Sequence, residues 1–206
     1  MESSPAAQNL PFAESTPLGL LGLAVGCAAL TPVAFGVALT PSALETAAWF
    51  CLLFGGGGQF LAGLMALANK NLLGGTLFTT FSFNWVMNWW ALHELAAGRP
   101  PDGSVVLAVD VCFLVIFVVL TYAFGFLSKI LVVFLLDIDL LYALRIARAT
   151  LHIASLGPFV GVCTVALALI ALWIAFAMLV NTTAGRAVFP LPGPLFALTP
   201  AQVPAR

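Results

Sequence analysis

Three carboxylates stand inside long apolar stretches of the sequence, where an ionised side chain is costly. Asp110 lies in one stretch, and Asp137 and Asp139 lie two residues apart in the next. A charged group at membrane depth costs on the order of 3 kcal/mol unless it faces water or a partner. Such acids either exchange protons as a solute passes or form structural hydrogen bonds and ion pairs, here with Arg145 or Arg148. All three are therefore candidates for proton coupling.

The spacing of Asp137 and Asp139 predicts that the two acids have different surroundings. Residues two apart on a helix point roughly 200° away from each other, so Asp137 and Asp139 cannot both face one cavity. We expect one of them to line a path and the other to meet a neighbouring helix.

A polar stripe precedes these acids in the sequence. Thr76, Thr80, Asn84 and Asn88 follow one another at intervals of four, with Thr79 beside them. One slowly rotating helix face would then offer hydroxyls and amides along much of its length, which is typical of a surface that lines a solute path. Alternatively, the threonines bond to their own backbone and the asparagines join helices.

Other chemistries fit the sequence poorly. The segment HELAAG at His93 lacks the second histidine of a zinc-protease motif, and no serine nucleophile elbow is present. The four cysteines fall in four different apolar segments without metal-ligand spacing. The formal net charge is −1 and no basic run occurs, which argues against nucleic acid. We expect no enzymatic activity, no cofactor and no metal site.

The elements that must position these residues are long apolar helices. Hydrophobic residues make up 62% of the 206 positions and charged residues only 7%, a balance typical of a protein whose solvent is lipid. About 20 apolar residues span a bilayer as a helix. Six stretches qualify, which predicts an all-α polytopic membrane protein: Leu18–Leu39, Thr46–Ala68, Leu72–Leu92, Ser104–Leu127, Ile130–Ala149 and Phe159–Val180.

The ends of these stretches predict domain boundaries. Thr16 before Pro17 suits the start of the first helix, and Ser42 with Glu45 suits a capping box at the second. We expect a polar N-terminal tail over 1–16, a six-helix domain over 17–185 and a proline-rich C-terminal tail over 186–206.

Charge also predicts an orientation. With six spans both termini lie on one side, together with Lys70, Lys129, Arg186 and Arg206, whereas the other side has Arg99, Arg145 and Arg148. The positive-inside rule then favours cytoplasmic termini in a cell membrane, either inner or plasma.

Four blocks of sequence resemble the acetate uptake transporter family, in order and in spacing. The family includes bacterial acetate/succinate permeases. The blocks are PLGLLGL at Pro17–Leu23, FGGGGQFLAGL at Phe54–Leu64, NLLGGTLFTTFSFNW at Asn71–Trp85, and GRAVFP at Gly185–Pro190. The resemblance covers nearly the whole chain. It implies a homohexamer in which each six-helix protomer has its own narrow path for acetate and related monocarboxylates, sometimes succinate.

The resemblance also implies site residues. It places the family's apolar constriction at Leu23, Phe81 and Ile138, where the family has an aromatic residue, a tyrosine and a leucine. Hydrogen bonds along the path would come from Gln59, Thr76, Thr79, Thr80 and Asn84.

This chain departs from the family pattern at several positions. Glu14-Ser15 stands in place of Asn-Pro, and Asp137 and Asp139 flank Ile138 where Ser and Thr-like residues are expected. Carboxylates beside a carboxylate path favour a protonated substrate or accompanying protons. They also leave two other hypotheses open: a passive channel for a neutral or cationic solute, and a membrane assembly or sensor protein without transport.

Overall fold

The computed structural model describes residues 11–197, and every element in that range is helical. The elements are α1 (Thr16–Ala34), α2 (Pro41–Phe50), the π-helix η1 (Cys51–Gly58), α3 (Gln59–Ala68), α4 (Leu72–Ala96), α5 (Gly103–Phe124), α6 (Lys129–Leu151), the short 3-10 helix η2 (Ala154–Leu156) and α7 (Gly157–Ala184). The segments α2, η1 and α3 follow without a break and form one rod over Pro41–Ala68. The described chain therefore contains six long rods, and each predicted stretch falls on one of them.

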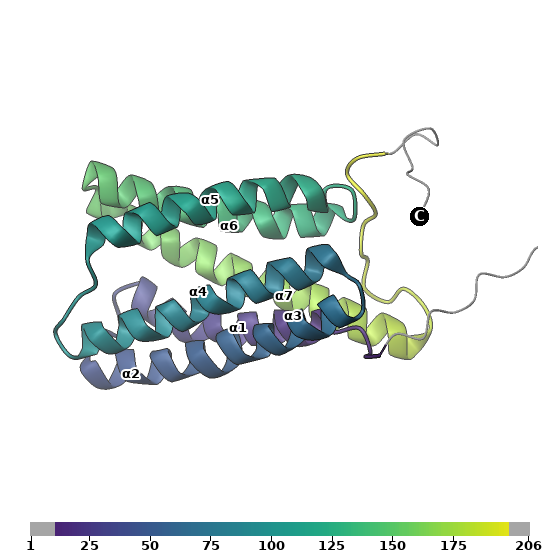
Figure 1. Ribbon diagram of the computed structural model, residues 1–206, viewed down its shortest axis with the longest axis horizontal. Coiled ribbons are helices and arrows are strands. Elements are labelled where there is room, and N and C mark those ends of the chain that lie inside the picture. Colours follow the sequence, from purple (N-terminus) through teal and green to yellow (C-terminus); the bar gives the residue numbers. More distant parts are fainter. Residues whose placement is uncertain (1–10, 198–206) are drawn as a thin grey trace, which may run out of the picture.

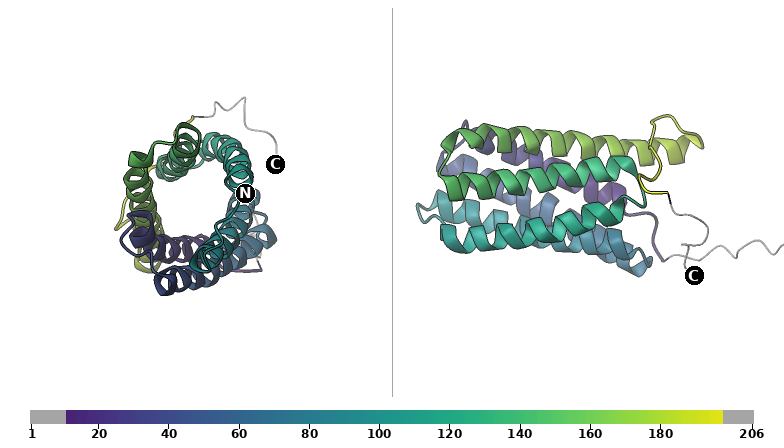
Figure 2. Two further views of the ribbon diagram at one scale, coloured as in Figure 1. Left: turned by 90° about the vertical axis from the view of Figure 1, so that its left-hand side faces the viewer. Right: turned by 90° about the horizontal axis from the view of Figure 1, so that it is seen from above.

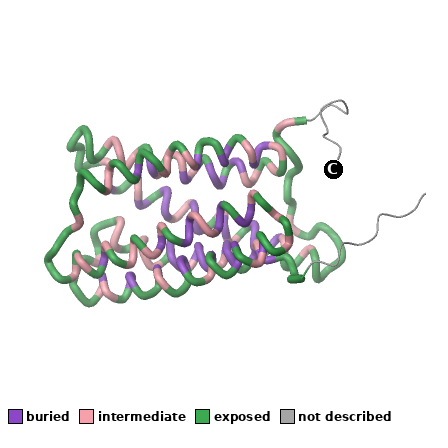
Figure 3. The backbone as a smooth tube through the Cα atoms, in the orientation of Figure 1, coloured by how far each residue is buried: buried purple, intermediate pink, exposed green. Residues whose placement is uncertain are grey.

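Successive rods run in opposite directions and close into a ring when viewed along the bundle (Figures 1 and 2). Around this ring, α1 lies between α7 and the α2–η1–α3 rod, that rod packs on α4, and α6 joins α5 to α7. The helices α4 and α5 share little contact, although they are consecutive in the chain. Buried positions gather on the inward faces, whereas half of the residues of α5 are exposed (Figure 3).

Four of the rods are long and apolar enough to cross a membrane: α1, the α2–η1–α3 rod, α5 and α7. The other two are equally long but more polar. Asn84 and Asn88 lie on α4, and α6 carries Asp137, Asp139 and Arg145. These two helices are therefore the more polar rods, and α5 lies between them around the ring.

Glycines allow the closest helix contacts. A Cβ atom at Gly22 of α1 would clash with the backbone carbonyl of Phe54 in η1, and one at Gly55 would clash with the Trp85 ring of α4. Helix backbones approach this closely only where side chains are absent. The glycine run therefore sets the packing of α1, η1 and α4.

Two predicted helix starts are wrong. The first helix has Ser15 as its N-cap, so Thr16 is already helical. In the second, Pro41 takes the first helical position, which suits a residue without an N–H, and Thr40 Oγ1 accepts a hydrogen bond from Ala43 N at 3.3 Å. The predicted capping box of Ser42 with Glu45 does not form.

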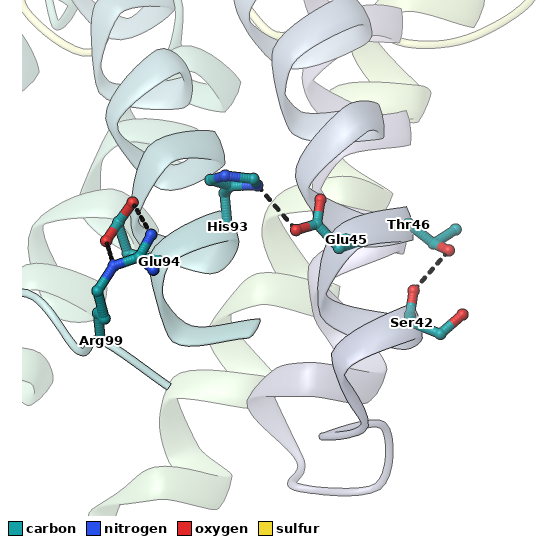
Figure 4. A network of polar contacts seen from close by, with 6 residues as sticks. All are labelled: Ser42, Glu45, Thr46, His93, Glu94 and Arg99. Atoms are coloured by element: carbon teal, nitrogen blue, oxygen red, sulfur yellow. Dashed lines mark hydrogen bonds and ion pairs between the residues drawn. The ribbon is translucent and has the colours of Figure 1, made fainter. Parts of the chain in front are cut away.

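The side chains near that second start have other partners. Glu45 pairs with His93 of α4, with 2.8 Å from Oε1 to Nδ1, while the backbone oxygen of Ser42 accepts from the Thr46 hydroxyl at 2.8 Å (Figure 4). Glu45 therefore joins α2 to α4 and does not cap its own helix.

The chain after α7 folds back onto the turn between α5 and α6. The backbone N–H groups of Leu195 and Phe196 both donate to the carbonyl of Gly125, and the Phe196 ring packs on Tyr122 and Phe126 with centroids 5.3 and 5.0 Å away. The proline-rich segment is thus fixed as far as residue 197. The outer parts of both predicted tails, 1–10 and 198–206, lie outside the described residues.

Candidate solute path

A cavity of about 190 Å³ lies between α1, α4, α6 and α7, and we call it the inner cavity. Its lining runs from Phe81 to Asn88 on α4 and from Ile138 to Arg145 on α6. Seven residues of helix rise about 10 Å. The inner cavity therefore extends from mid-bundle toward the end formed by the α4–α5 and α6–α7 connections.

The floor of the inner cavity is apolar and closed. Phe81 is 5% exposed and Ile138 is 1% exposed, and both line the floor. Leu23 is fully buried in the same apolar cluster but does not line the cavity. The Phe81 ring meets Phe117 edge-on at 5.1 Å. The three residues of the predicted constriction are thus all buried in the apolar core, and two of them line the inner cavity.

An ion pair lies at the other end of the inner cavity. Arg145 Nε and Nη2 each lie 3.0 Å from a carboxylate oxygen of Asp110 on α5, which makes a two-point fork. The guanidinium carbon also lies 5.7 Å from the centre of the Tyr142 ring. Asp110 is almost fully buried, whereas about a third of the Arg145 side chain is exposed. This geometry holds the guanidinium in one place while leaving part of it accessible.

A second hollow of about 340 Å³ lies between α4 and α5, where these helices separate, and we call it the outer hollow. Its walls are mainly apolar, and Pro101 and Asp102 lie at its end. Asn84, Asn88 and Arg145 line both the outer hollow and the inner cavity. These three side chains therefore form the partition between the two spaces.

The two acids beside Ile138 turn away from the inner cavity. Asp139 Oδ2 accepts a hydrogen bond from the Thr121 hydroxyl of α5 at 2.7 Å, and Asp137 lies beside the Cys163 thiol of α7. Neither lines the cavity. Asp137 Oδ2 and Asp139 Oδ1 are buried without a hydrogen-bond partner in the described part of the chain. The predicted divergence of the pair is confirmed, since each acid faces a different helix interface. The expectation that one of them lines the path is not met at the inner cavity.

Only the last of the predicted path residues on α4 reaches the inner cavity. Thr76 is exposed, and the Thr79 hydroxyl donates to the backbone carbonyl of Gly75 at 2.6 Å. Thr80 is half-buried outside the cavity lining, and Asn84 lies within the lining. Steps of four residues turn the face by about 40° each time on an α-helix. The stripe therefore winds from the outer surface into the cavity.

Gln59, the remaining predicted path residue, lies apart from the inner cavity. It begins α3 directly after the glycine run and is 1% exposed. Its Oε1 atom has no hydrogen-bond partner among residues 11–197. The Gln59 side-chain oxygen is therefore free to accept a hydrogen bond in the buried interior of the bundle.

The sequence predicted Arg145 as a partner for an acid and as a charge on one side of the membrane, but not its position in the inner cavity. A signal was present, because Ile138, Tyr142 and Arg145 are spaced as i, i+4 and i+7, which places them on one helix face. Thr164 of α7 was also missed, and its hydroxyl donates to its own helix at 2.9 Å.

The end of the bundle near the outer hollow is charged. Hydrogen bonds from the Ser104 hydroxyl and from the backbone N–H groups of Val105 and Ser104 lower the pKa of Asp102. Arg99 Nε and Nη2 donate to the two carboxylate oxygens of Glu94, in the last turn of α4, at 2.7 and 3.0 Å (Figure 4). Asp102, in the α4–α5 connection, thus remains ionised near neutral pH.

Comparison with known proteins identifies the fold. No protein-family model matches the chain, and no curated protein matches it. Among solved structures, that of the bacterial acetate channel SatP superposes with a TM-score of 0.78 and 22% sequence identity, covering 87% of this chain and 99% of that one. The chain therefore has the same helical fold as that channel.

Proposed function

We propose that this chain is a membrane transporter or channel for small monocarboxylates such as acetate. The observation that carries the proposal is the inner cavity, which has a guanidinium at one end and an apolar floor at the other. Acetate has a charged group and a methyl group in the same arrangement. The shared fold with an acetate channel supports the same substrate class.

The proposed constriction is the layer of Leu23, Phe81 and Ile138. An anion that enters a dry apolar layer loses its hydration without compensation, whereas a neutral acid of the same size does so at a much lower cost. Transport across this layer therefore favours protonated acetate or a proton that moves with it. Asp110, Asp137 and Asp139 are the proposed proton-exchanging groups, and succinate is a further candidate substrate.

We place all six rods across the membrane. The low hydropathy of α4 and α6 is compatible with spanning, because polar side chains of both helices line internal spaces and not lipid. Lys70, Lys129 and Arg186 support termini on the cytoplasmic side of a cell membrane, by the positive-inside rule. The half-exposed, apolar α5 supports lipid or subunit contact, and the proposed assembly is a homohexamer, by the family resemblance.

The test is uptake of labelled acetate into proteoliposomes, with and without an inward proton gradient, for the unmodified protein and for Asp137→Asn and Asp139→Asn. Saturable uptake that the gradient drives, and that one variant uncouples, is the result expected of proton-linked transport. Flux that ignores the gradient would identify a channel. Absence of acetate flux would refute the substrate class.

A passive path for a neutral solute is the second candidate. The closed apolar floor favours it, since a neutral molecule crosses such a layer most easily. Excess acetate would then leave the flux of a neutral probe such as glycerol unchanged, whereas competition by acetate would refute this candidate. If neither solute crosses, a non-transporting assembly or sensor is the remaining interpretation.

A further inference from the structure

We infer that Arg145, Asn84 and Asn88 form a carboxylate-selective site between the outer hollow and the inner cavity, and that Asp110 acts as its internal competitor. This inference rests on the proposed function and extends it by naming the residues that select the substrate. It begins from the partition that these three side chains make between the two spaces.

The partition has unused hydrogen-bond donors. A guanidinium has five N–H groups, and Asp110 engages only Nε and Nη2 of Arg145. No other described residue accepts a hydrogen bond from it. Asn84 and Asn88 lie one helical turn apart on α4, and their amides also have no hydrogen-bond partner within residues 11–197. Three groups with free donors thus converge where a solute passes from one space to the other.

Charge singles out Arg145 among the residues that line the two spaces. It is the one basic side chain there among the described residues, and its fork matches the geometry of a carboxylate. Arg148, one turn further along α6, is exposed and belongs to neither lining. A carboxylate in transit therefore meets one cation, and the position of that cation is fixed by Asp110 and Tyr142.

Asp110 explains how such a site can release its ligand. A lone guanidinium in a water-poor space would hold an anion tightly, but transport requires binding that is weak enough for exit. Asp110 holds two of the donors and offsets part of the guanidinium charge, so a passing anion that binds the remaining donors competes with it for the same cation. Its negative charge also repels a second carboxylate on the solute. The pair therefore favours monocarboxylates over dicarboxylates.

Four variants separate this role from a structural one, and flux of acetate, of its neutral analogue acetamide and of succinate is measured for each in proteoliposomes. The double variant Arg145→Gln/Asp110→Asn replaces the pair by two amides without leaving a buried charge. Asp110→Asn keeps the cation alone. The exchange Arg145→Asp/Asp110→Arg keeps the pair but moves the cation to α5, outside the inner cavity. Arg148→Gln is the matched control.

We expect the double variant to lower the acetate/acetamide flux ratio about tenfold, since hydrogen bonds to charged groups have effects of this size. Asp110→Asn should tighten the apparent acetate affinity severalfold and raise succinate flux relative to acetate. The exchange variant should be stable yet fail to recover the acetate preference, and Arg148→Gln should behave like the unmodified protein.

An unchanged acetate/acetamide ratio in the double variant, or full recovery in the exchange variant, would show that the pair is only structural and would overturn the inference. These outcomes differ from failure of the proposed function, in which the unmodified protein itself carries no acetate. A double variant that does not fold still leaves the exchange variant and Asp110→Asn to decide the question.

Discussion

Removing the Phe81 ring should open the proposed constriction. Phe81 lines the floor of the inner cavity, is 5% exposed and packs edge-on against Phe117 at 5.1 Å. In Phe81→Ala the space vacated by the ring adjoins the inner cavity, so the closed layer becomes thinner. We expect faster acetate flux and passage of larger monocarboxylates that the unmodified protein excludes.

The same substitution has a cost in stability that can be worked out. If about 100 Å³ stays empty, the cavity term of about 24 cal/mol per Å³ gives about 2–3 kcal/mol, and the lost transfer energy brings the total to about 3–5 kcal/mol. A change of that size can also disturb transport indirectly. The control variant must therefore lose a similar amount of stability without opening the proposed constriction.

Phe78 supplies that control. It lies on the same helix, is 2% exposed, packs against Gly19 of α1 and does not line the inner cavity. Phe78→Ala should cost a similar free energy of unfolding while leaving the size limit for solutes unchanged. Size-selective flux in proteoliposomes, paired with thermal unfolding in detergent, measures both effects. The reasoning is refuted if Phe81→Ala keeps the original size limit, or if Phe78→Ala relaxes it equally.

Three further changes test the surrounding structure. Thr121→Val removes the one hydrogen-bond partner that the described residues give Asp139, so thermal unfolding should show a loss of about 1–3 kcal/mol; an unchanged stability would mean that water replaces the hydroxyl. Thr40→Ala should lower the free energy of unfolding by about 1 kcal/mol because it removes the N-cap, while Ser42→Ala should change it little. A larger loss for Ser42→Ala than for Thr40→Ala would instead support a capping box at Ser42. Phe196→Ala should expose the chain after α7 to proteolysis, because its ring is the main apolar anchor on the α5–α6 turn; protection equal to that of the unmodified protein would contradict this.

The helices could be predicted because each is a long apolar run bounded by polar or turn-forming residues. Their exact ends could not. Both Thr40 before Pro41 and Ser42 before Glu45 fit the start of α2, and sequence spacing alone does not decide which residue becomes the cap. The π-helical hydrogen bonding over Cys51–Gly58 was not predicted either, and glycines in this segment lie against Gly22 of α1 and Trp85 of α4.

The candidate site could be predicted only in part, since it depends on how each helix is rotated. The opposite directions of Asp137 and Asp139 follow from helix geometry within one element. Pairing of an acid with Arg145 or Arg148 was one predicted alternative, and Asp110 does pair with Arg145. The two residues are 35 positions apart on two helices, so no local spacing selects that acid or that arginine. The interval of four residues suggested one continuous face, but the face rotates along the helix, so Thr76 lies at the surface while Asn84 lines the inner cavity.

The central claim is that acetate crosses the bundle through the inner cavity, and cysteine accessibility tests it most directly. Asn88→Cys would place a thiol in the partition, and Ser42→Cys would place one on the exposed start of α2. A membrane-impermeant cationic methanethiosulfonate is added to proteoliposomes while labelled acetate efflux is followed, with the unmodified protein as the baseline for its native cysteines. We predict that modification of Asn88→Cys blocks acetate flux, that excess acetate slows the modification, and that modified Ser42→Cys stays active. Complete modification of Asn88→Cys with unchanged acetate flux would contradict the account.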